Sequence, residues 1–239
     1  MLSDRAFVRR GSRDEAEKPF WISFSDLMTA LMVLFLTAMS VALLAVTKRV
    51  SDEAREKEAR EQSLRALLER IQQEAASYQG LTVDFDRHSI NFGPRATFQF
   101  ASDSLSEDGG ALLREFVPRI LRVAREDQSK RWLKRIIVEG FTDEKGSYLF
   151  NLDLSLRRSQ RVLCALLSPT TSQTVELSTG DREMIRDLFL VGGYSFNSPR
   201  KTAEESRRIE LRLEFFEVGE GPSDTREIVH GDFGSCAIK

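Results

Sequence analysis

The chain has 239 residues, 41% of them hydrophobic, and a formal net charge of -2. This length accommodates one domain of ordinary size with appendages. The small net charge gives no general electrostatic reason for nucleic-acid binding, so we expect no nucleic-acid partner. Residues 1–18 are charged and lack apolar periodicity, which predicts a short N-terminal stub.

Residues 19–47 form an apolar segment that predicts a transmembrane helix. From Phe20 to Thr47 the chain contains no Lys, Arg or Glu and a single Asp, and a membrane-spanning helix needs about 20 apolar residues. A cleaved signal peptide has an apolar core of only about 7 to 15 residues, so we expect a retained anchor. Basic residues flank the segment on both sides, and charge alone therefore does not orient it.

Asp26 is the single acidic residue inside this segment. It lies about 9 Å along the helix, where an ionised Asp costs about 2.5 to 3.5 kcal/mol. A helical wheel places small and polar residues on the same face: Ser23, Thr29, Ala30, Val33, Thr37 and Ser40. The charged carboxylate is disfavoured in a low dielectric, so Asp26 is the predicted ion-translocating residue. Ser23, Thr29 and Ala30 are predicted to line the ion path. The alternative is an Asp that only bonds to a partner helix and holds an assembly together.

Residues 48–79 predict a helical linker. The part from 51 to 78 is rich in Glu, Arg, Gln and Ala and has no Pro or Gly, a composition that favours helix. One apolar stripe follows helical spacing: Leu64, Leu67, Leu68, Ile71, Ala75 and Tyr78. This stripe either pairs with a second copy of the chain or packs onto the domain that follows, and the periodicity does not choose between them.

Residues 80–218 predict a domain of the α/β class, a sandwich of helices and strands. The expected elements, in order, are a strand pair over 83–92, a helix over 112–121 with a kink at Pro118, a strand over 136–138, a helix over 151–167, a short helix over 181–188, a segment through Val191 and a strand over 209–215. Residues 219–239 show no periodicity and predict a C-terminal tail.

The two cysteines, Cys164 and Cys236, both follow the apolar segment. If that side is the oxidising periplasm, they can form a disulfide that ties the tail to the domain. The alternative is a buried Cys164 on a helix face and a free thiol in the tail.

The apolar segment resembles the membrane helix of MotB-type stator subunits. The shared residues are Trp21, Asp26, Met28, Thr29, Ala30, Met32, Phe35 and Leu36. The resemblance implies that Asp26 binds the transported ion, that the chain is a homodimer inside a ring of a MotA-like membrane partner, and that the N-terminus is cytoplasmic.

Residues 80–218 resemble the OmpA-like peptidoglycan-binding domain. The matching motifs are Phe100, Ser104, Leu105 and Gly109; Gly140, Phe141, Thr142 and Asp143; Asn151, Leu154, Ser155, Arg158, Ser159 and Val162; and Arg207, Arg208, Ile209 and Glu210. The resemblance implies peptidoglycan contacts by Thr142, Asp143, Asn151, Leu154 and Arg158. Two residues depart from the family pattern: Phe141 stands where His is common, and Ser206 stands where Asn is common.

The residues themselves suggest how such a site works. A carboxylate at a strand end and a guanidinium one helix later can hold a zwitterionic amino acid, with Asp143 receiving the ammonium and Arg158 the carboxylate. Diaminopimelate in a peptidoglycan stem peptide is such a group. The alternative is a structural salt bridge between the two side chains.

The compact layout, together with residues 19–36 and 146–158, looks most like ZorB, the stator-like subunit of Zorya anti-phage systems. This resemblance implies a pentamer of a ZorA partner around a dimer, in the bacterial inner membrane, with the C-terminal domain in the periplasm. It also implies that proton flow serves phage defence.

Other functions stay open at this stage. A flagellar-type motility stator and a passive tether between the inner membrane and the wall share the same layout. We expect no enzyme, no cofactor and no metal site, because His88 and His230 lack metal-ligand spacing and there is no nucleophile motif or phosphate-binding Gly loop. An Asp among Ser and Thr can serve protons or sodium, and the absence of a visible cation cage favours protons.

Overall fold

The computed structural model describes residues 14–168, 176–221, 233, 234 and 236, and the side chains from residue 21 on except those of residues 22, 23 and 128. The chain forms two compact units, Met1–Arg55 and Glu56–Lys239. Most of the stub expected over 1–18 and most of the tail expected from 219 lie outside the described residues.

The described part of the first unit, residues 14–55, is helical. It contains the greater part of α1 (Asp14–Ala75), the one helix of the described chain that is long and apolar enough to cross a membrane. Its large apolar side chains are exposed, for example Leu34, Phe35 and Leu44, so they require lipid or partner helices around them. The hydroxyls of Thr29, Thr37 and Ser40 donate to carbonyls of the preceding turn, which satisfies them within the helix as a bilayer demands.

The end of α1, from Glu56 on, belongs to the second unit. The predicted stripe is buried there, with Leu68 2% and Ile71 1% exposed. These side chains belong to the same hydrophobic core as the strands, and the helix is further held by the hydrogen bond from Arg60 Nε to Phe216 O. Packing onto its own domain is therefore the alternative that the structure confirms, and this stripe does not pair with a second copy.

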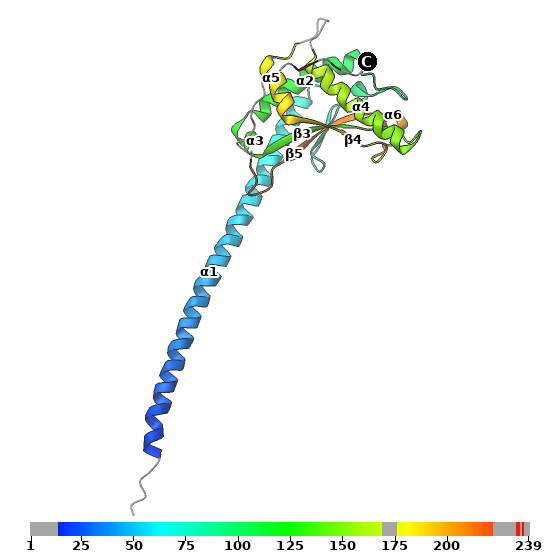
Figure 1. Cartoon of the computed structure of the whole chain (residues 1–239). Helices are drawn as coiled ribbons and strands as arrows, with labels where there is room; N and C mark the ends of the chain where they lie inside the picture. The colour runs from blue at the N-terminus through cyan, green and yellow to red at the C-terminus, as the bar shows by residue number, and fades with distance from the viewer. Residues whose placement is uncertain (1–13, 169–175, 222–232, 235, 237–239) are drawn as a thin grey trace, which may run out of the picture. The chain divides into compact units, whose positions relative to one another are not determined.

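The second unit has one five-stranded sheet with the strand order β1-β2-β5-β3-β4 (Figure 1). The strands are β1 (Thr82–Asp84), β2 (Ser89–Asn91), β3 (Leu133–Gly140), β4 (Phe189–Gly193) and β5 (Ile209–Phe215). Strands β3 and β4 are parallel, whereas the other neighbouring pairs are antiparallel. The sheet, with helices between its strands, confirms the predicted α/β class.

The remaining helices of this unit are η1 (Gly93–Ala96), α2 (Glu107–Ala124), α3 (Asp127–Trp132), α4 (Tyr148–Leu167), α5 (Thr179–Leu188) and α6 (Ala203–Ser206). Helix α4 begins three residues before its predicted start because Ser147 Oγ accepts a hydrogen bond from Phe150 N and caps it. Pro118 lies inside α2, which continues to Ala124.

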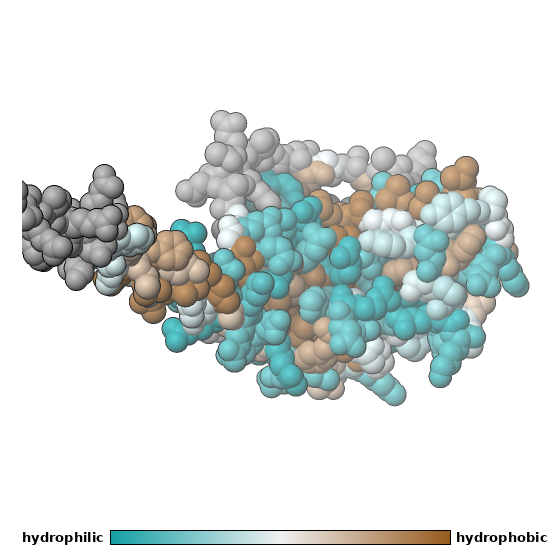
Figure 2. Space-filling model, turned by 90° about the horizontal axis from the view of Figure 1, so that it is seen from below, coloured by the Kyte–Doolittle hydropathy of each residue, from teal (hydrophilic) through white to brown (hydrophobic). Residues whose placement is uncertain are grey.

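The two faces of the sheet differ in chemistry. Side chains alternate along a strand, and Ile136, Val138 and Leu211 are fully buried in a core that also contains residues of α1, α2 and α4. The opposite face carries charged residues, among them Glu139 and Glu210. In Figure 2 the visible face of this unit is largely hydrophilic, whereas the visible helical residues of α1 are largely hydrophobic.

Candidate functional site

Asp26 lies in the apolar part of α1, between exposed apolar neighbours such as Leu27 and Met28. Its carboxylate has no hydrogen bond or ion pair to any other described residue. Thr29 and Ala30 follow one helical turn later, on the same face as Asp26. Thr29 Oγ1 donates to Ser25 O over 2.7 Å, so its hydroxyl oxygen is still able to accept. The side chain of Ser23 lies outside the described residues.

The predicted wall-binding residues meet where β3 ends and α4 begins. Gly140, the last residue of β3, lies so close to α4 that a Cβ atom there would be 2.0 Å from Ser155 O. This contact needs glycine, and it seats α4 against the strand end. Thr142 and Asp143 follow directly, and both are at most 5% exposed.

Asp143 is held in one orientation by two hydrogen bonds. Its Oδ1 accepts from Lys145 N, and its Oδ2 accepts from Arg207 Nη1 over 2.8 Å. Asn151 Nδ2 donates to Lys145 O and Ser147 O, which fixes the turn between β3 and α4. Thr142 Oγ1 is buried without a hydrogen-bond partner among the described residues.

Arg158 lies beside Asp143 but does not pair with it. It is fully buried and donates to three backbone carbonyls, from Nε to Ser102 O, from Nη1 to Phe141 O and from Nη2 to Gln99 O. Burial, and then the nearby charge of Arg207, lower the pKa of Arg158 to about 10, so the guanidinium stays charged at neutral pH. Its contacts hold the segment 99–102 in place, and the Asp143–Arg158 salt bridge that was the alternative to ligand binding is not formed.

Arg207, and not Arg158, forms the salt bridge with Asp143. It is 18% exposed, its Nε donates to Phe98 O, and it precedes β5 in the chain. The sequence signal was present, because Arg207 belongs to the paired arginines before the last strand, but nothing in the sequence placed it 2.8 Å from Asp143.

The recess formed by these residues is nearly closed. It is lined by Phe100, Ala101, Thr142, Asp143, Lys145, Phe150, Asn151, Leu154, Arg158 and Arg207, and its volume is about 10 Å³. That volume holds about one water molecule. A larger ligand therefore has to displace the Asp143–Arg207 pair or the segment 99–102.

The two departures from the family pattern have structural roles here. The ring of Phe141 is stacked on Tyr194 at 5.4 Å between centroids, and the guanidinium of Arg208 lies 4.1 Å from it. Ser206 Oγ accepts from Arg200 N and donates to Thr202 O. Both residues stabilise the segment before β5.

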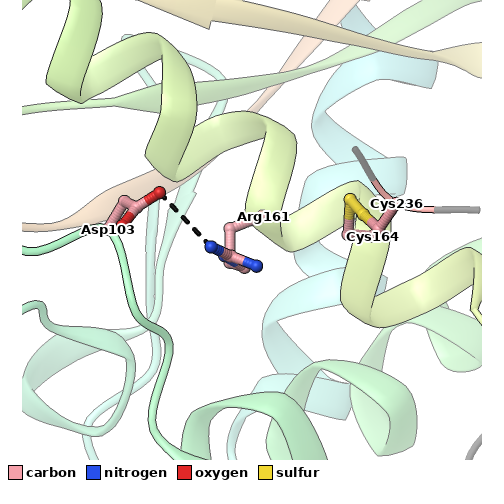
Figure 3. The surroundings of a disulfide bond; sticks show 4 residues. All are labelled: Asp103, Arg161, Cys164 and Cys236. Atoms are coloured by element: carbon pink, nitrogen blue, oxygen red, sulfur yellow. Dashed lines mark hydrogen bonds and ion pairs between the residues drawn. A yellow bond between two sulfur atoms is a disulfide. The ribbon is translucent and has the colours of Figure 1, made fainter. Parts of the chain in front are cut away.

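Cys164 and Cys236 form a disulfide, with 5.8 Å between their Cα atoms (Figure 3). Cys164 lies on α4 one turn after Arg161, which pairs with Asp103. The disulfide closes a loop with a sequence separation of 72. It therefore ties the last described residue of the chain to α4.

Replacing Cys236 with Ser is expected to lower the free energy of unfolding by at most about 4 kcal/mol, because the cross-link restricts the unfolded chain. Thermal unfolding of the full chain in detergent, without reductant, measures the loss. Dithiothreitol should shift the wild-type Tm by the same amount and leave that of Cys236→Ser unchanged. Equal Tm values for both proteins without reductant would contradict the stabilising role.

Among the described residues there is no group of three or more His, Cys, Asp or Glu side chains that could hold a metal ion. The two candidate sites are thus a lone carboxylate in an apolar helix and a polar recess at a strand end.

Three solved structures are similar to the chain at low identity. A putative MotB-like protein from Desulfovibrio vulgaris has a TM-score of 0.46 and 17% identity, covering 66% of this chain and 98% of that one. The cell wall anchor of the T6SS from Pseudomonas aeruginosa has a TM-score of 0.39 and 23% identity, covering 63% and 97%. The OmpA-like domain of FopA1 from Francisella tularensis has a TM-score of 0.34 and 13% identity, covering 57% and 82%. None of these scores reaches 0.5, so we draw no functional argument from them.

A sequence relative gives the assignment. No protein-family model matches the chain. It is, however, 42% identical over 217 residues to Zorya protein ZorB of Escherichia coli O139:H28 (strain E24377A / ETEC), a match that covers 90% of this chain and 88% of that protein. The chain therefore belongs to the ZorB family.

Proposed function

We propose that the chain is the ion-carrying, wall-anchored subunit of a proton-driven motor in the inner membrane, acting in anti-phage defence. The observation that carries the proposal is Asp26, a carboxylate in an otherwise apolar exposed helix with no partner among the described residues. A group that is costly in lipid is usually retained for ion transfer. Membership of the ZorB family supports the role in defence.

The proposed assembly is a homodimer surrounded by a pentamer of a ZorA-type membrane partner. The N-terminus is cytoplasmic and the second unit is periplasmic. The disulfide supports this orientation, because structural disulfides form and persist in oxidising compartments. The exposed apolar side chains of α1 leave room for partner helices around Asp26.

Proton flux through the assembly tests the central claim. Proteoliposomes containing the chain and its ZorA-type partner are given a pH gradient, and a pH-sensitive dye inside reports proton entry. The wild-type complex is expected to pass protons, whereas the Asp26→Asn complex is not, because an amide carries no transferable proton at neutral pH. Equal flux from the two complexes would rule out Asp26 as the carrier and leave a tether as the better description.

The recess at Asp143 is the proposed wall-binding site. A diaminopimelate zwitterion can enter by exchange: its ammonium replaces Arg207 at Asp143, and its carboxylate replaces Asp143 at Arg207. Arg158 has the role of holding the segment 99–102, with its remaining N–H groups at the recess wall. Each charge of the Asp143–Arg207 pair thus finds a new partner.

Wall binding is tested by co-sedimentation of the full chain with purified sacculi. Asp143→Asn is expected to weaken binding at least about tenfold, since a hydrogen bond to a charged group contributes about 1.5 to 3 kcal/mol. Asp153→Asn is the matched control, because Asp153 is exposed and Arg157 is its one ion-pair partner in the part of the chain that the structure describes. Equal sedimentation of Asp143→Asn and wild type, at equal Tm, would remove the recess from the wall-binding surface.

A further inference from the structure

A second concave site lies in the same unit, between the β1–β2 hairpin, η1 and α6. This groove has a volume of about 610 Å³ and is lined by Gly80, Thr82, Asn91, Gly93, Pro94, Thr97, Arg200, Thr202, Glu204, Glu205 and Arg208. It shares no lining residue with the recess at Asp143. Small-molecule sites typically have volumes of about 300 to 1,000 Å³, so the groove can hold a ligand without rearrangement.

Two arginines are among the residues that line the groove. Arg208 is 2% exposed; its Nε donates to Glu210 Oε1 and its Nη1 to Ser198 O, but its Nη2 has no partner among the described residues. Arg200 is 38% exposed, and its Nη2 donates to Glu210 Oε1, whereas its Nε and Nη1 have no partner among the described residues. A buried donor without a partner is costly, but Arg208 Nη2 has almost no accessible surface. Arg208 therefore contributes its charge, and Arg200 contributes the exposed donors.

The charge around Glu210 is unbalanced toward the positive. Three guanidiniums lie within hydrogen-bond or ion-pair distance of this one carboxylate: Arg208 at 2.6 Å, Arg200 at 2.9 Å and Arg87 at 3.5 Å. The other buried carboxylate nearby, Glu139, is paired with Arg212 and also lies 3.9 Å from Arg87. The two buried carboxylates carry two negative charges against the four positive charges of these arginines. An anionic group is therefore favoured beside Arg200, which is 38% exposed.

The lining of the groove also carries negative charge. Glu204 and Glu205, in the first turn of α6, are exposed, and their carboxylates have no hydrogen bond or ion pair to any described residue. Thr202 caps this helix by accepting from Glu205 N. The lining of the groove therefore combines the exposed guanidinium of Arg200 with two carboxylates that are unpaired among the described residues.

We propose that this groove is a second binding site, for an amino acid or peptide end that carries both a carboxylate and an ammonium group. Arg200 receives the carboxylate, with the charge of Arg208 behind it, and Glu204 and Glu205 receive the ammonium. If the ligand is a peptidoglycan stem peptide, the site rests on the proposed wall-binding function and adds a second contact. If it is a free amino acid, the site is independent of that function.

Isothermal titration of the full chain in detergent micelles tests the proposal with two probes, free meso-diaminopimelate and the tripeptide L-Ala-γ-D-Glu-meso-diaminopimelate. The informative variant is the double substitution Glu204→Gln with Glu205→Gln, because both side chains are exposed and unpaired, so the fold is kept. Lys201→Gln is the matched control, a charge next to Arg200 that does not line the groove. Arg200→Gln, with its Tm compared, tests the carboxylate partner.

The expected result is two binding sites in the wild type, one of which weakens at least about tenfold in the double variant and in Arg200→Gln. Asp143→Asn should remove the other site alone, which separates the two proposals. Stronger binding of the tripeptide than of free diaminopimelate at the groove assigns the wall as the source, and equal binding assigns free amino acids. The groove site would be overturned if the double variant and Arg200→Gln both bound the two probes with the affinity of the wild type. The proposal for the recess at Asp143 would be unaffected by that result.

Discussion

Asp26→Asn is expected to reduce phage protection to that of cells without the defence operon. Asparagine has nearly the shape of aspartate and keeps a hydrogen-bonding group, so the packing of α1 should be preserved. The substitution removes the titratable group. Because an ionised Asp costs about 2.5 to 3.5 kcal/mol in a membrane helix, replacing it with a neutral residue should not destabilise the helix in the membrane. The measurement is the efficiency of plating of phage on cells that express the whole operon with either form of the chain.

The control for this experiment is another polar residue of the same helix, one that does not serve as the proton carrier. Ser40 is on the Asp26 face of the predicted wheel, and its hydroxyl donates to Leu36 O. Ser40→Ala should therefore leave protection unchanged. A membrane-fraction blot must show equal amounts of all three forms. Full protection by Asp26→Asn would contradict an ion-carrying role and favour a passive tether.

Local patterns were enough to predict most of the second unit. Alternating apolar residues predicted β5, and helical periodicity predicted α2 and α4, because these elements bury one face against a single core. Helix α3 (Asp127–Trp132) was missed, since six residues with one buried aromatic show no period. The apolar stripe from Leu64 to Tyr78 predicted a buried face, but only the fold shows that its own domain covers it.

The candidate wall site was predicted less completely. Sequence motifs identified Asp143 and Arg158 and assigned them to the two charges of one ligand, but they did not predict the partner that Asp143 has in the structure. The topology brings Arg207, which is 64 residues away in the chain, to Asp143. The chain leading into β5 runs beside the end of β3, because these two strands are antiparallel neighbours. Such a contact depends on strand order, which a single sequence does not reveal. Asp26, in contrast, could be identified from the sequence alone, because a single acidic residue within an apolar segment is recognisable without knowledge of the fold.

The charged face of the sheet is held by a buried network centred on Glu210. Glu210 is fully buried and lies directly opposite Glu139 in the β3–β5 register. Its Oε1 accepts from Arg208 Nε over 2.6 Å and from Arg200 Nη2 over 2.9 Å. Two buried carboxylates on adjacent strands would repel each other, so the arginines are required for this arrangement.

Glu210→Gln is therefore expected to destabilise the second unit by about 3 to 5 kcal/mol, the usual result of removing one partner from a buried ion pair. Thermal unfolding of the full chain measures this as a lower Tm at pH 7. Glu214→Gln is the matched control, because Glu214 is 35% exposed in its pairs with Arg135 and Arg212 and such surface pairs contribute about 0 to 1 kcal/mol. Equal Tm shifts in the two variants would show that burial adds nothing to the Glu210 network.

The same network gives a pH dependence with a definite sign. Burial alone would raise the pKa of Glu210, but the hydrogen bonds and charges of Arg208 and Arg200, with the charge of Arg87, outweigh it and lower the pKa below its ordinary value of 4.5. A carboxyl with a lowered pKa in the folded state stabilises the fold above its unfolded pKa, and this contribution is lost as the pH falls through the folded value. The Tm difference between wild type and Glu210→Gln should therefore be constant from pH 7 to about 5.5 and shrink in more acidic solution. A difference that instead grows below pH 4.5 would mean that the carboxyl is protonated more easily in the folded chain, and that the arginines do not compensate for its burial.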